Sequence, residues 1–234
     1  MFELITEADW ENCTDLDSAY YCALPRISGR KVRLFEVACC RRLLPHLILP
    51  ASRDALDQLE RFADDPPPET EAKAVTAAAR GAADSLYDHG WVTGATVHWL
   101  AASAVVGVAD VYRGAVLNAA AHAVWILNRN PPTTDPEQFE WDLDKGEDKV
   151  QLELLRDIFG NPFRPVALDP SWRTSAVVAV ARRMYEARDF DPMPHLADAL
   201  QDAGCEVGAV LDHCRGPGPH ARGCWVVDGV LGRA

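Results

Sequence analysis

Apolar residues recur along most of this chain with the spacing of an amphipathic helix. In residues 30–46, for example, Phe35, Cys39 and Leu43 fall on one side of a helical wheel. Proline and glycine interrupt the pattern at clear breaks, such as residues 64–68 and 128–132. The pattern predicts one helix that starts at Thr6, and further helices near residues 15–24, 30–46, 52–63, 69–87, 96–106, 108–127, 134–159, 174–188, 192–203 and 206–213.

Two short stretches read as strand instead, namely residues 166–168 and the apolar tail at residues 224–231. The fold class predicted from the whole pattern is mainly α: a multi-helix, bundle-like body followed by a small C-terminal helical segment with a Gly/Pro loop. Residues 160–170 contain three prolines and cannot form a regular helix. We therefore expect an N-terminal helical body over residues 1–160 and a C-terminal helical segment, residues 161–234, packed on that body.

One uncharged stretch, residues 91–109, is long enough to raise the question of a membrane helix. Alanine, glycine, threonine, serine and histidine dilute its apolar character, and Asp110 and Arg113 follow directly. We interpret it as a buried helix at the centre of the core, and we expect no membrane partner.

The 234 residues include 23 basic and 35 acidic side chains, giving a net charge of −12. That balance argues against general binding to a nucleic-acid backbone, which requires a basic surface. The opening residues, MFELITEADW, do not resemble an export signal. Seven cysteines without a CxxC pair indicate reduced thiols, so a cytoplasmic location is expected.

Charge is segregated along the chain. Residues 135–157 hold nine acids against three bases, a net of −6, whereas residues 26–42 carry a net of +5. In one interpretation both stretches are solvent-exposed helix surfaces that lie opposite each other within the fold. In the other, the acidic stretch is a docking surface for a basic protein partner. In the second interpretation the partner surface consists of Trp141, Asp142, Asp144, Glu147 and Asp148.

The densest cluster of residues suited to chemistry lies near the C-terminus. Thiolates and imidazoles are ligands that zinc prefers, and five of them fall within twenty residues: Cys205, His213, Cys214, His220 and Cys224. In the alternative interpretation the cysteines are small buried residues and the histidines bind loop carbonyls. The same loop also offers anion contacts through Arg215 and Arg222, beside the backbone N–H groups of its glycines.

Enzyme motifs are missing from the sequence, which contains no GxSxG, HExxH or GxGxxG pattern. Cys39 and Cys40 precede two arginines that could lower a thiol pKa, but the helical pattern places Cys39 on the apolar face, where cysteines are usually inert. The sequence therefore favours a protein that is not an enzyme.

Four segments together resemble a multi-copy family of planctomycetal bacterial proteins. They read EADWENCTD (residues 7–15), GRKVRLFEVACCRRL (29–43), LLRDIFGNPFRPVALDPSW (154–172) and LADALQDAGC…HCRGPGPHARGCWVVDGVLG (196–232). The resemblance implies a bacterial cytoplasmic setting and no particular reaction. By analogy alone, it suggests an accessory or adaptor role, including a place in defence or toxin-neutralising systems.

These observations lead to one expected function and two alternatives. We expect a cytoplasmic binding or regulatory protein that acts through protein–protein contacts. The first alternative is a zinc-binding metalloprotein, or a thiol-dependent enzyme, that uses the C-terminal Cys/His residues. The second is an accessory subunit of a nucleic-acid-targeting complex, in which residues 26–42 contact phosphate groups.

Overall fold

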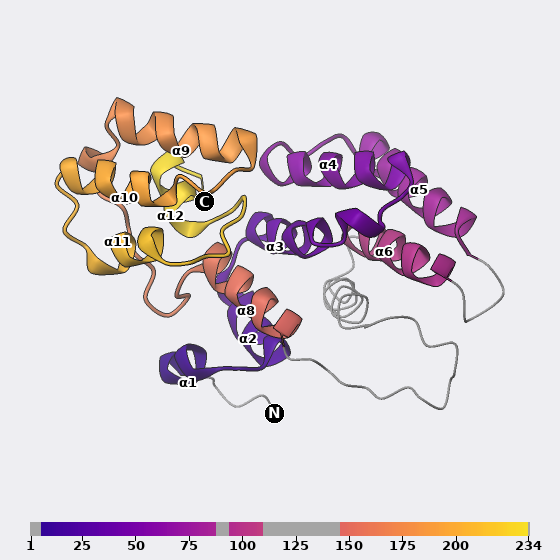
Figure 1. Ribbon diagram of the computed structural model, residues 1–234, viewed down its shortest axis with the longest axis horizontal. Helices are drawn as coiled ribbons and strands as arrows, with labels where there is room; N and C mark the ends of the chain where they lie inside the picture. Colours follow the sequence, from indigo (N-terminus) through magenta and orange to yellow (C-terminus); the bar gives the residue numbers. More distant parts are fainter. Residues whose placement is uncertain (1–5, 88–93, 110–145, 234) are drawn as a thin grey trace. The chain divides into compact units, whose positions relative to one another are not determined.

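The computed structural model describes residues 6–87, 94–109 and 146–233, and within these ranges the regular structure is helical (Figure 1). Short 3-10 turns join several of the α-helices. The predicted mainly α fold class is confirmed. The α-helices are α1 (Glu7–Asn12), α2 (Leu16–Ala23), α3 (Gly29–Arg41), α4 (Pro50–Asp64), α5 (Glu69–Ser85), α6 (Gly94–Ala109), α8 (Gly146–Phe159), α9 (Ser175–Ala187), α10 (Met193–Asp202), α11 (Gly208–Arg215) and α12 (Trp225–Leu231).

Side-chain caps fix where several of these helices begin. The Thr6 hydroxyl accepts a hydrogen bond from the backbone N–H of Asp9 at 3.3 Å, and the Asp9 carboxylate accepts one from the backbone N–H of Thr6 at 2.7 Å. This reciprocal pair is a capping box with aspartate at its end, and it confirms the predicted helix start. The side chains of Asp15 and Thr174 cap α2 and α9 by accepting a hydrogen bond from the backbone N–H of Ser18 and Val177, respectively.

The described helices divide into two compact units. The first unit joins residues 1–31 to residues 152–234, and the second comprises residues 32–151. The boundary predicted between residues 160 and 161 falls within the first unit, which contains the end of α8 together with the C-terminal helices.

Each unit has its own apolar core. The second unit packs α4, α5 and α6 around side chains such as Leu56, Phe62 and Val105. The first unit packs α9, α10, α11 and α12 around Met184, Leu196 and Val226.

The predicted strand over residues 224–231 is wrong, because Trp225–Leu231 form helix α12. Its three valines favour strand by propensity. However, Val226, Val227 and Val230 are all buried, and this spacing fits one face of a helix rather than the alternation of a strand. The other stretch expected as strand, residues 166–168, has no regular secondary structure.

Helix α6 covers most of the uncharged stretch that raised the membrane question, and it continues through the break expected near residue 107. Ala101, Ala104 and Val105 are completely buried in the core of the second unit. In the ranges that the structure describes, none of the helices combines the length and apolar character needed to cross a bilayer. The rest of the predicted helix at 108–127, and the first part of the one at 134–159, lie outside the described residues.

Candidate metal centre

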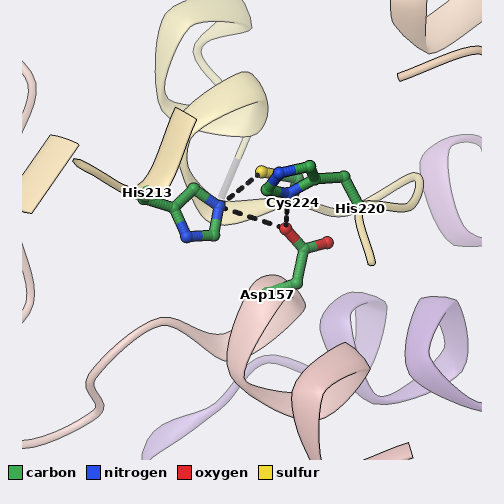
Figure 2. Close-up of side chains that lie close together, drawn as sticks. All are labelled: Asp157, His213, His220 and Cys224. Carbon is green, nitrogen blue, oxygen red and sulfur yellow. Dashed lines mark hydrogen bonds and ion pairs between the residues drawn. The ribbon is translucent and has the colours of Figure 1, made fainter. Parts of the chain in front are cut away.

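Four side chains from three parts of the first unit meet at one point (Figure 2). Asp157 lies in the last turn of α8 and His213 in α11, while His220 belongs to the Gly/Pro loop and Cys224 directly precedes α12. One ligand atom from each residue lies within 4.8 Å of the other three. We call Asp157, His213, His220 and Cys224 the Asp157 cluster.

The distances within the Asp157 cluster are those of hydrogen bonds. His213 Nε2 lies 3.2 Å from Cys224 Sγ and 3.1 Å from Asp157 Oδ1, and His220 Nδ1 lies 2.7 Å from the same Asp157 oxygen. The second carboxylate oxygen, Oδ2, accepts a hydrogen bond from the backbone N–H of Ala221 at 2.9 Å. The histidine nitrogens and the sulfur therefore surround one oxygen, and the other oxygen is fixed by the loop.

The Nε2 nitrogen of His213 contacts both Cys224 and Asp157, and hydrogen bonding alone does not account for both contacts. An imidazole nitrogen carries at most one proton, so His213 Nε2 cannot fully donate to both Cys224 and Asp157. The ligand atoms of a tetrahedral zinc ion, bound at about 2.0–2.3 Å, lie about 3.3–3.6 Å from one another. The three hydrogen-bonded spacings in the cluster, 2.7, 3.1 and 3.2 Å, are shorter than this, and no two of the four ligand atoms lie more than 4.8 Å apart, so the side chains would have to move to coordinate the ion.

The cluster is enclosed by protein. The side chains of Asp157, His220 and His213 are 3%, 9% and 18% exposed, and Cys224 is fully buried. Burial acts to raise the pKa of the Asp157 carboxyl, but hydrogen bonds and charge interactions with the two histidines outweigh it, and the net pKa is lowered. Burial, and then the charge of Asp157, raise the pKa of the Cys224 thiol well above its ordinary value.

Two glycines allow the chain to form this arrangement. Gly160 ends α8 at φ +65°, and a Cβ atom there would lie 3.1 Å from Cγ of Trp225, whose ring packs against His213 with centroids 5.1 Å apart. Gly218 has φ +75°, and a Cβ atom there would lie 3.3 Å from Cδ2 of His220. A larger residue at Gly160 would displace Trp225, which packs against His213, and one at Gly218 would displace the ring of His220.

Comparison with known protein families, curated proteins and solved structures found no match. Interpretation of the Asp157 cluster therefore rests on its chemistry and geometry.

The structure brings together three of the five residues expected to bind metal: His213, His220 and Cys224. Cys205 and Cys214 lie instead among the apolar side chains of the first unit's core. Burial raises the pKa of the Cys214 thiol to about 12, as expected for a packing residue.

Asp157 was missed by the sequence analysis, which assigned it to an acidic surface. The sequence does contain a signal for it. Asp157 is an acid in an otherwise largely apolar segment at the end of a helix, LLRDIFG, with Arg156 directly before it. Since an acid in such a position is buried only when it is paired or binds a metal, its setting points to a partner.

The expected partner surface receives little support from its described part. Trp141, Asp142 and Asp144 lie outside the described residues. Glu147 is buried, and its carboxylate binds the guanidinium of Arg42 through two 2.5 Å hydrogen bonds. Asp148 is half-buried. Glu147 therefore serves an internal ion pair between the acidic and basic stretches.

The two arginines proposed as anion contacts do not meet at a common point. Arg215 binds Asp198 at 3.0 Å and Gln201 at 2.7 Å. Arg222 donates to the backbone oxygen of Tyr185 at 2.8 Å, and its guanidinium lies 4.4 Å from the centre of that ring. Both arginines hold protein groups in place.

Most of the basic residues at 26–42 also have acidic or aromatic partners within their own unit. Arg30 and Lys31 bind Asp228 at 2.6 and 2.7 Å, and Arg41 binds Asp57 and Glu60. Arg26 lies over the ring of Phe163. These contacts occupy the side chains that a phosphate backbone would need, and so they disfavour the nucleic-acid interpretation.

Proposed function

We propose that the chain is a zinc-binding protein and that the Asp157 cluster is its metal centre. The observation that carries the proposal is that four ligand atoms, two imidazole nitrogens, one carboxylate oxygen and one sulfur, all lie within 4.8 Å of one another. Two imidazole nitrogens, a carboxylate and a thiolate form a ligand set that suits zinc. The carboxylate and the thiolate supply two negative charges, so a divalent ion gives a neutral site in a buried place.

The closed geometry supports a structural role for the metal rather than a catalytic one. Catalytic zinc keeps one position for water or substrate and is held by three protein ligands. Here all four positions are supplied by the chain, and the most exposed ligand, His213, is only 18% exposed. Zinc bound in this way links the end of α8 to α11 and to the start of α12.

A thiol-dependent enzyme is less well supported by the same atoms. In a nucleophile–base–acid arrangement, one ring nitrogen faces the nucleophile and the other faces the orienting carboxylate. In the Asp157 cluster both Cys224 and Asp157 face Nε2 of His213. The thiol of Cys224 is also fully buried, which keeps it from a substrate.

Elemental mass spectrometry on tag-free protein tests the proposal. We expect about one zinc per chain in the wild-type protein, and its loss in Asp157→Asn and Cys224→Ser. Cys214→Ser is the matched control, because Cys214 is equally buried but lies outside the cluster. Any one of three results would refute the proposal. Cys224→Ser could retain the metal, Cys214→Ser could be the only variant that loses it, or the wild-type protein could remain metal-free after zinc loading.

In the cell, we propose that this metal-stabilised protein acts as a binding or regulatory module in a bacterial cytoplasm, through contacts with another protein. The closed metal site and the absence of enzyme motifs from the sequence support a non-enzymatic role. Affinity capture with the zinc-loaded protein, compared with Cys224→Ser, tests it. A partner that binds both forms equally would show that the metal centre does not contribute to recognition.

A further inference from the structure

Hydrogen bonds and an ion pair join the N-terminal helix α1 to the part of the chain that contains Asp157. Arg156, the residue before this ligand, donates from its Nη2 to the backbone oxygens of Trp10, Glu11 and Cys13, at 3.1, 3.3 and 2.7 Å. These oxygens lie at the C-terminal end of α1, where a helix leaves carbonyl groups without partners in the helix. Arg156 thus closes the end of α1 on the last turn of α8.

Glu7 fastens the other end of α1. Its carboxylate accepts a hydrogen bond from Nδ2 of Asn161 at 3.0 Å and binds the guanidinium of Arg164 at 2.9 Å. Asn161 in turn fixes the turn after α8, because its Oδ1 accepts a hydrogen bond from the backbone N–H of Arg164. The two ends of α1 therefore bind residues 156–164, and Asp157 lies within that range.

By itself α1 is too short to be stable. It has six residues, and helices of this length do not persist in water without tertiary contacts. Trp10 is its one fully buried side chain among the described residues of the helix. Segments held by so few contacts open at a lower free energy than the core of a protein.

We propose that α1 is a clasp that sets the zinc affinity of the Asp157 cluster. The proposal rests on the proposed function, because it concerns how tightly that cluster holds its metal. While α1 is docked, the last turn of α8 is fixed and Asp157 Oδ1 stays in the site. When α1 detaches, Arg156 and Asn161 lose partners, the end of α8 loosens and a ligand is lost. A protein that captures α1 would thus release the metal.

Arg156 is a positioning residue in this scheme, and substitutions there give the first test. Zinc dissociation constants are measured by competition with a chromophoric chelator for wild type, Arg156→Leu and Arg156→Lys. Direct outer contacts of a metal ligand contribute about 10–100-fold in affinity, and Arg156 acts on Asp157 through the end of α8 without touching its carboxylate, so we expect about tenfold weaker binding by Arg156→Leu. Arg156→Lys keeps a cation with N–H donors and should recover part of the loss. Arg183→Leu, at an exposed arginine of α9, is the matched control.

Two further readouts separate positioning from a general loss of stability. The zinc-induced rise in Tm should shrink in Arg156→Leu, whereas a purely structural role would lower the Tm of the metal-free and zinc-bound forms equally. Because coupling between two sites is reciprocal, zinc should also slow amide hydrogen exchange in residues 7–13 of the wild-type protein. This measurement needs no variant and stands if Arg156→Leu fails to fold.

The outcomes separate this proposal from the one before it. A wild-type protein that binds no zinc refutes the metal centre itself. A wild-type protein that binds zinc, with unchanged affinity in Arg156→Leu or unchanged exchange in residues 7–13, refutes the clasp and leaves the metal centre intact.

Discussion

Glu36 in α3 is a buried carboxyl group that must hold its proton in the folded protein, and this should cost stability at neutral pH. Its side chain lies among core residues, and the residue is only 8% exposed. Burial raises the pKa of Glu36 from an ordinary value of 4.5 to about 8, with Arg33 acting weakly in the opposite direction. We predict that Glu36→Gln, which cannot ionise and keeps the shape, makes the protein more stable at pH 7.

The magnitude follows from the two pKa values. A group whose pKa is higher in the folded state stabilises the fold fully below its unfolded pKa, and this contribution is lost as the pH rises through the folded pKa. For Glu36 the loss runs from about pH 4.5 to about pH 8. Each pKa unit corresponds to about 1.4 kcal/mol, so about 3 kcal/mol has been lost at pH 7. For a chain of this size, this free energy corresponds to roughly 6–12 °C in Tm.

Chemical denaturation of wild type and Glu36→Gln between pH 4.5 and 8 measures this difference. The difference between the two proteins should be near zero at pH 4.5 and should grow to about 3 kcal/mol at pH 7. Effects of pH on metal binding are common to both proteins and cancel. Glu69→Gln is the matched control, because the side chain of Glu69 is 80% exposed. A difference that does not change with pH, or a less stable Glu36→Gln at pH 7, would refute the reasoning.

Three further predictions concern the packing and the metal. Arg42→Leu leaves the buried carboxylate of Glu147 without its cation and should cost about 2–3 kcal/mol in urea denaturation, whereas removing both charges together should cost less. Gly160→Ala should lower the Tm, because the φ of +65° and the closeness of Trp225 both oppose a side chain there. Gly81→Ala should raise the free energy of unfolding by about 0.5–1 kcal/mol, because Gly81 lies inside α5 and a Cβ atom there meets no other atom. Removal of zinc by a chelator should lower the Tm of the wild-type protein and leave the Tm of Cys224→Ser unchanged. Equal shifts of Tm in the two proteins would count against a bound metal.

The helical fold could be predicted because its signals are local. The spacing of apolar residues and the capping box at Thr6 and Asp9 depend on neighbours within a few positions. Helix α12 could not be predicted in this way. It has seven residues, and its valines favour strand by propensity. Its helical conformation is decided by tertiary burial, which no short window of sequence contains.

Part of the proposed metal centre could be predicted from residue types. Cys224 and the two histidines are side chains of the kind that binds zinc, and they lie in or next to one glycine-rich loop, so their proximity could be expected. Asp157 could not, because its carboxylate reaches the site from a distant helix. Cys214 lies apart from the Asp157 cluster, because successive residues in a helix point about 100° apart and a helical His213 that faces the cluster turns its neighbour toward the core.

Three of the four ligands lie within twelve residues of one another at the C-terminus, whereas Asp157 lies 56 positions upstream of His213. Closing a long chain segment is entropically more costly than closing a short one, and contacts that are distant in sequence form late in folding. Zinc held first by His213, His220 and Cys224 would give the C-terminal residues a local nucleus before α8 arrives. The carboxylate of Asp157 would then complete the coordination sphere, so that metal capture and assembly of the first unit become steps of one folding process.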